Sequence, residues 1–122
     1  MNSANSTRRD PRHELPGDTS IVEFPEPLSG TKDLSAVLTR ISVAGLAFET
    51  TSSPTLHAGA IIKGVTVRVG DCRLHGDLVV QYLETAKSPD VEAGCLFYPS
   101  GAPDADRLMA LIAGIEVARI KA

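Results

Sequence analysis

The sequence predicts a mainly β protein, a small six-stranded antiparallel β-barrel with a C-terminal α-helix packed on it. Three observations support this fold class. Six short apolar stretches alternate with Gly, Pro, Ser and Asp from position 19 onward, a two-residue turn signal joins two of them, and the apolar period changes after Pro103. The 122 residues are the usual length of one domain.

The N-terminal stretch, residues 1–18, is expected to be a flexible basic arm outside the barrel. It is rich in Asn, Ser and Thr, holds Pro11, Pro16 and Gly17, and has almost nothing to bury. Residues 19–122 then form a single domain.

The expected strands are short and bounded by turn residues. Their ranges are 20–24, 34–41, 46–50, 61–69, a run that contains Leu74 and Tyr82, and 91–98. Gly70 and Asp71 separate the fourth strand from the fifth, which is a hairpin signal.

The fourth and fifth strands alternate most clearly. One face of the fourth carries Val65, Val67 and Val69. In the fifth, one face is expected to hold Leu74, Leu78, Val80 and Tyr82, and the other Arg73, His75, Asp77 and Gln81.

The last twenty residues change to a helical period. Apolar side chains recur at i, i+3, i+4 and i+7, namely Leu108, Leu111, Ile112 and Ile115. Asp104 and Asp106 near the start, with Arg119 and Lys121 near the end, match the preference of the helix dipole.

The composition excludes several classes of protein. No run approaches the roughly 18 apolar residues of a membrane span, and residues 1–12 are too polar for a secretory signal, so a cytoplasmic location is expected. Cys72 and Cys95 are too few for a disulfide scaffold or a metal knuckle and are expected to be buried small hydrophobes.

Catalytic patterns are not found in the sequence. The three histidines are far apart, and there is neither a Gly-rich phosphate loop before a helix nor a G-x-S-x-G motif. We therefore expect no enzyme, no metal site and no cofactor.

The net charge of −3 is unevenly distributed. Residues 1–13 contain three Arg and one Asp, whereas the remainder holds nine Lys/Arg and fourteen Asp/Glu. An acidic body with only five aromatic residues argues against long nucleic acid and against an oligonucleotide-binding barrel. A small anion at the basic arm remains compatible with this distribution.

Arginines in the arm form the first part of a candidate site. Arg8 and Arg12 bracket three residues, and Arg9 stands beside the first. Four residues of extended chain span up to ~14 Å, so two guanidinium groups can grip one nucleotide-sized ligand. Arginine forms paired hydrogen bonds with phosphate or guanine and stacks on bases. A solvated, solubilising tail is the alternative.

A serine and a glycine between two expected strands form the second part. Ser42 stands three residues before Gly45. Glycine permits a close backbone approach, and the serine hydroxyl can donate or accept a hydrogen bond. The alternative is an ordinary corner between strands.

Together these residues resemble the PilZ domain family, the bacterial receptors for cyclic di-GMP. The family pattern is R-x-x-x-R in the leading arm, then D/N-x-S-x-x-G. Residues 8–12 match the first motif, but the second is degenerate, since it keeps Ser42 and Gly45 and has Arg40 where the family has Asp or Asn. Residues 94–97 (Gly-Cys-Leu-Phe) are similar to the family's late strand, and the resemblance covers roughly residues 8 to 120.

The resemblance implies a function in second-messenger signalling. Arg8 and Arg12 would clamp cyclic di-GMP, Arg9 would be an auxiliary cation, and Ser42 and Gly45 would form the facing platform. It further implies that the ordered arm signals to a downstream protein partner.

Position 40 leaves two alternatives open. An aspartate would accept hydrogen bonds from guanine N–H groups, whereas arginine has no acceptor. Arg40 can instead contact a phosphate or the guanine O6/N7 edge, which makes it a candidate ligand residue. Otherwise the chain is a non-nucleotide-binding adaptor for protein partners, for instance in pilus or motility machinery. The intact arginine pair favours retained binding.

Overall fold

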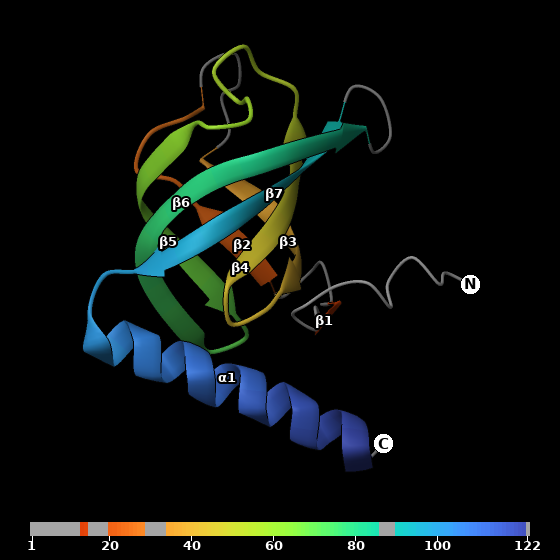
Figure 1. Ribbon diagram of the computed structural model, residues 1–122, viewed down its shortest axis with the longest axis vertical. Helices are drawn as coiled ribbons and strands as arrows, with labels where there is room; N and C mark the ends of the chain where they lie inside the picture. The colour runs from red at the N-terminus through yellow and green to blue at the C-terminus, as the bar shows by residue number, and fades with distance from the viewer. Residues whose placement is uncertain (1–12, 15–19, 29–33, 86–89, 122) are drawn as a thin grey trace.

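The computed structural model describes residues 13–14, 20–28, 34–85 and 90–121, and within these ranges seven strands precede one helix (Figure 1). The strands are β1 (His13–Glu14), β2 (Ser20–Glu23), β3 (Ser35–Ile41), β4 (Gly45–Thr51), β5 (Ile61–Val69), β6 (Cys72–Thr85) and β7 (Asp90–Pro99). The helix is α1 (Ala102–Lys121).

Six of these strands close into an antiparallel barrel. β2, β5, β6, β7 and β4 pair in that order, β4 pairs with β3, and β3 pairs with β2 to complete the circle. This arrangement confirms the predicted six-stranded barrel with a C-terminal helix. Each strand expected from the sequence overlaps one of the six.

The hairpin between β5 and β6 has the predicted two-residue loop. Val69 pairs with Cys72, which leaves Gly70 and Asp71 as the connection. Gly70 has a φ of 58°, in the left-handed region that glycine adopts without strain.

Alternating side chains from all six strands fill the barrel. Those that are least exposed include Val22, Leu38, Leu46, Phe48, Val65, Val67, Leu74, Leu78 and Val80. Phe24 and Phe48 meet edge to face with ring centroids 5.5 Å apart. Cys95 is buried in the same core and Cys72 packs at its margin, both as free thiols.

The helix α1 lies across one end of the barrel (Figure 1). Leu108 and Ile112 on its predicted apolar face are buried against the barrel. Asp104, in the first turn, accepts a hydrogen bond of 3.0 Å from the backbone N–H of His75 on β6. One carboxylate therefore fixes the start of the helix to the barrel. Within the described residues, no helix combines the length and apolar character that crossing a bilayer requires.

The register of β6 shifts at Gln81, which corrects one expectation. Val80 pairs with Cys95 and Tyr82 with Gly94, so Gln81 is an extra residue opposite β7. Strict alternation would have placed Tyr82 with Val80 in the core. The bulge instead turns Tyr82 to the outer face of the barrel.

The short strand β1 lies beside the second half of β3. His13 pairs with Ile41 and Glu14 with Arg40, while β2 pairs with the first half of β3. His13 and Glu14 are the described residues of the expected arm. Their pairing through backbone groups fixes where the arm meets the barrel.

Candidate ligand site

The turn between β3 and β4 is closed by Ser42. Its N–H donates to the Gly45 carbonyl at 2.8 Å, and its Oγ accepts from the N–H groups of Ala44 at 3.3 Å and Gly45 at 3.2 Å. The side chain is only 3% exposed. Because the hydroxyl is engaged within the turn, the exposed part of the turn is formed by Val43, which is 42% exposed, and Ala44.

Gly45 permits a close approach between β4 and β7. A Cβ at this position would lie 2.2 Å from the carbonyl oxygen of Cys95. Such a distance is not possible without a backbone shift. The glycine of the turn is therefore required by the packing of two strands, whatever else it does.

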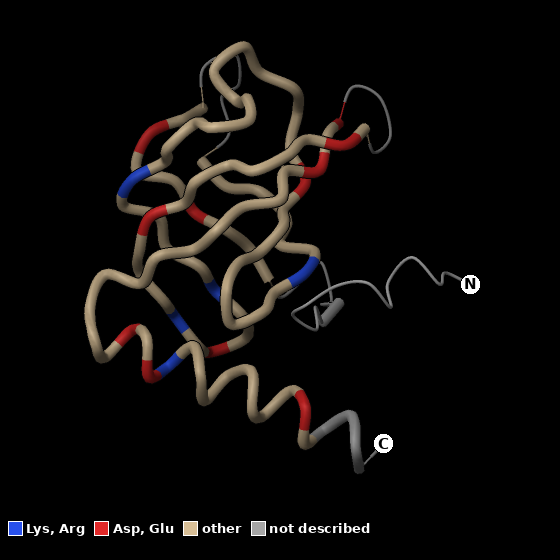
Figure 2. Tube along the Cα trace, viewed as in Figure 1, with Lys and Arg blue, Asp and Glu red and all other residues tan. Residues whose placement is uncertain are grey.

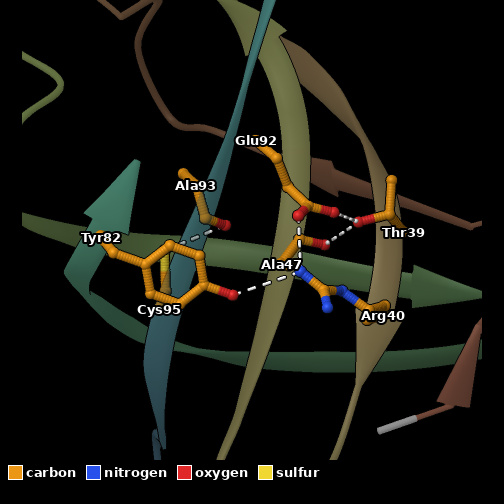
Figure 3. A network of polar contacts seen from close by, with 7 residues as sticks. All are labelled: Thr39, Arg40, Ala47, Tyr82, Glu92, Ala93 and Cys95. Atoms are coloured by element: carbon orange, nitrogen blue, oxygen red, sulfur yellow. Dashed lines mark hydrogen bonds and ion pairs between the residues drawn. The ribbon is translucent and has the colours of Figure 1, made fainter. Parts of the chain in front are cut away.

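Arg40 reaches over β4 to β7 and β6 (Figure 3). Its Nη2 lies 2.5 Å from Oε1 of Glu92 and donates to the hydroxyl of Tyr82 at 3.2 Å. The side chains of Arg40 and Glu92 are each 17% exposed. The ion pair is thus largely shielded from water, where charge-assisted hydrogen bonds are stronger than at an open surface.

A bulge in β3 brings Arg40 to the same outer face as Thr39. Leu38 pairs with Phe48 and Arg40 with Ala47, so Thr39 is an extra residue. Its Oγ1 lies 2.8 Å from Oε2 of Glu92.

Both carboxylate oxygens of Glu92 therefore have a partner on β3. Thr39 Oγ1 also lies 3.2 Å from the carbonyl oxygen of Ala47. The carboxylate is held in one orientation from two sides.

Small residues make this long reach possible. Across four adjacent strands, Arg40 pairs with Ala47, Ala47 with Gly94, and Gly94 with Tyr82. A Cβ on Gly94 would lie 2.1 Å from the Tyr82 ring, so the ring rests directly on the glycine backbone. The side chains of Arg40 on β3 and Tyr82 on β6 can consequently meet above β4 and β7.

Arg40 retains unused donors. Its Nε is buried without a hydrogen-bond partner. Within the described part of the chain, Nη1 makes no hydrogen bond either. The guanidinium therefore keeps donor capacity beyond the contacts with Glu92 and Tyr82.

Acidic side chains flank Glu92 on both sides. Glu92 pairs with Glu49 on β4 and with Glu84 on β6, and Figure 2 shows acidic positions gathered along this part of the barrel. Like charges directly opposite each other destabilise a sheet. Arg40 offsets this repulsion by neutralising the central carboxylate.

Three of the six predicted site residues lie in the described ranges. Ser42 and Gly45 share one turn, and Arg40 lies on the outer face two residues before it. The other three, Arg8, Arg9 and Arg12, lie outside the described residues.

The sequence alone does not identify Glu92 as a partner of Arg40. The two residues are separated by 52 positions, and a single sequence does not reveal which residues of distant strands are neighbours. Tyr82 and the shared face of Thr39 and Arg40 were missed for a related reason, since bulges set the faces on which Tyr82 and Arg40 lie.

Nothing in the described ranges points to metal or thiol chemistry. No group of three or more His, Cys, Asp or Glu that could hold a metal ion occurs there. Burial raises the pKa of Cys95 to about 12, and that of Cys72 is raised mainly by desolvation. Neither thiol is activated as a nucleophile.

Comparison with known proteins shows similarity in structure rather than sequence. No family model matches the sequence, and no match is found among curated proteins. The complex of K. pneumonia MrkH with c-di-GMP gives a TM-score of 0.76 at 18% identity, over 93% of this chain and 54% of that chain. The chain spans about half the length of MrkH.

Two further structures agree with this comparison. The PilZ domain of YcgR from Escherichia coli with c-di-GMP gives a TM-score of 0.69 at 18% identity, over 94% of this chain and 96% of that chain. The Bacillus subtilis inhibitor of motility MotI/DgrA gives 0.69 at 14% identity, over 92% and 52%. The chain therefore has a PilZ-like fold.

Proposed function

We propose that the chain is a bacterial, cytoplasmic receptor for cyclic di-GMP whose arm arginines hold the ligand against the β3–β4 turn. The pairing of His13 with Ile41, the residue before Ser42, carries this proposal. Arg12 directly precedes His13, and consecutive Cα atoms are about 3.8 Å apart. Chain connectivity therefore keeps the arm arginines within reach of the turn.

The chemistry of the ligand suits these arginines. Cyclic di-GMP carries two phosphates and two guanines, and arginine recognises both groups through paired hydrogen bonds. Arg8 and Arg12 act as the clamp, and Arg9 adds a cation beside it. Two of the similar structures, MrkH and the PilZ domain of YcgR, hold c-di-GMP, which supports this choice of ligand.

The roles of Ser42 and Gly45 in this proposal are indirect. Ser42 Oγ is engaged inside the turn, and Gly45 allows the turn to lie close to β7. They contribute by holding the turn in a fixed shape. Arg40 contributes through Nη1, which can donate to a phosphate or to guanine O6/N7.

The signal follows from ordering of the arm. Binding fixes the arm on the barrel at a cost in conformational entropy, which charge-assisted hydrogen bonds to a dianion offset. The new surface is then read by a partner protein.

One observation favours a second function, that of an adaptor that binds protein partners without nucleotide. Arg40 stands at the position of the expected acceptor, and Glu92 and Tyr82 engage its guanidinium. In the adaptor, this network stabilises the outer face and has no part in recognition.

Calorimetric titration with cyclic di-GMP, with GTP as the control ligand, separates the two functions. Saturable binding of the cyclic dinucleotide alone supports the receptor and gives its stoichiometry. If the protein shows neither heat nor thermal stabilisation at high ligand concentration, the receptor proposal is wrong and the adaptor stands.

A further inference from the structure

The position of Glu92 suggests how a chain with arginine at position 40 can still recognise guanine. We propose that Glu92 supplies the carboxylate that accepts a hydrogen bond from guanine N1–H, with Arg40 beside it as the donor to guanine O6. This inference rests on the proposed receptor function. It identifies Glu92 as the residue that makes the receptor specific for guanine.

Geometry provides the first argument. Glu92 and Arg40 lie together on the outer face, with Oε1 2.5 Å from Nη2. A carboxylate offers about four lone-pair sites, and the contacts with Arg40 and Thr39 engage one on each oxygen. Both side chains keep 17% exposure, so remaining lone pairs can be approached from outside.

Rigidity provides the second argument. Thr39 and Arg40 hold the carboxylate, and the Tyr82 hydroxyl in turn contacts Arg40 at 3.2 Å. The Tyr82 ring is itself supported by the backbone of Gly94. Side chains fixed before binding lose little conformational entropy when a ligand arrives.

Base chemistry provides the third argument. Guanine presents an acceptor, O6, next to a donor, N1–H, whereas adenine presents a donor, N6–H, next to an acceptor, N1. A guanidinium donor beside a carboxylate acceptor matches the guanine order and opposes the adenine order. A shielded site that leaves such groups mismatched discriminates strongly against the wrong base.

Burial and pairing distinguish Glu92 from its acidic neighbours. Glu49 and Glu84 lie beside it on the same face, but both are exposed, and within the described residues neither forms an ion pair. Exposed and unrestrained carboxylates give little selectivity. They do provide a matched control, because Glu49→Gln removes the same charge one strand away.

The test measures the dissociation constants of cyclic di-GMP and cyclic di-AMP for the wild type, Glu92→Gln and Glu49→Gln. A well-formed base contact changes discrimination by roughly 5- to 150-fold. We therefore expect Glu92→Gln to reduce the preference for the guanine ligand about tenfold or more and to leave binding of the adenine ligand unchanged. Glu49→Gln should keep the wild-type preference.

The outcomes distinguish failure of this inference from failure of the proposed receptor function. If the wild type prefers cyclic di-GMP and Glu92→Gln prefers it equally, the inference is wrong while the receptor stands. If the wild type binds neither ligand, the receptor proposal fails and the inference fails with it. Should Glu92→Gln not fold, Glu92→Asp retains the charge, withdraws the carboxylate by one methylene, and should lose the same preference.

Discussion

Gly45 on β4 and Cys95 on β7 approach so closely that a Cβ on Gly45 would lie 2.2 Å from the Cys95 carbonyl oxygen. Gly45→Ala should therefore force two strands apart and lower the free energy of unfolding by about 1–3 kcal/mol. Urea denaturation measures this loss. Gly114→Ala is the matched control, because a Cβ there meets open space on α1 and should stabilise the helix slightly. Equal midpoints for the two variants would contradict the packing explanation.

The hydroxyl of Ser42 accepts from two backbone N–H groups of the turn. Ser42→Ala leaves these groups without that partner in a nearly buried position and should cost about 1 kcal/mol of stability. Thermal denaturation provides the measurement. Ser35→Ala, at the exposed first residue of β3, should change the melting temperature little. If Ser42→Ala were as stable as Ser35→Ala, the turn would not depend on the Ser42 hydroxyl.

Under the proposed function, Arg12→Ala removes half of the clamp. We expect at least a tenfold loss of affinity for cyclic di-GMP, because hydrogen bonds with charged groups contribute about 1.5–3 kcal/mol. The melting temperature should not change. Calorimetry on Arg73→Ala, which removes an exposed cation from β6, controls for net charge and should give wild-type affinity. Normal binding by Arg12→Ala would remove that residue from the site.

Burial raises the pKa of Cys95 from 9.0 to about 12. Between these values the unfolded chain binds fewer protons than the folded one, so stability should fall as pH rises, by up to about 1.4 kcal/mol per unit. Below pH 8 both states are protonated and the thiol contributes no pH dependence. Comparing unfolding of the wild type and Cys95→Ala from pH 7 to 10.5 isolates the effect. Parallel profiles would show that the thiol is not held in its neutral form.

The strands and the helix were predictable because their signals are local. Alternation in β5, the loop at Gly70 and Asp71, and the apolar face of α1 through Leu108 and Ile112 each depend on neighbouring residues. The short strand β1 carries no such signal, since it is defined by the backbone groups that it shares with β3.

The candidate site was predictable only in part, because its partners come from distant strands. Short motifs identified Arg40, Ser42 and Gly45. The contact between Arg40 and Glu92 depends on the register of β3, β4 and β7, and the orientation of Tyr82 depends on a bulge. Neither feature leaves a pattern in the order of residues along one strand.

The bulge at Thr39 divides β3 into two segments whose alternation is out of phase. Ala36 and Leu38 point into the barrel, and uninterrupted alternation would send Arg40 inward after them. Deletion of Thr39 would restore regular alternation, with Leu38 inward, Arg40 outward and Ile41 inward, and would keep the pairing of both segments with β4. The core therefore does not require the extra residue, and what it adds is a second polar side chain on the outer face, whose Oγ1 lies 2.8 Å from Oε2 of Glu92.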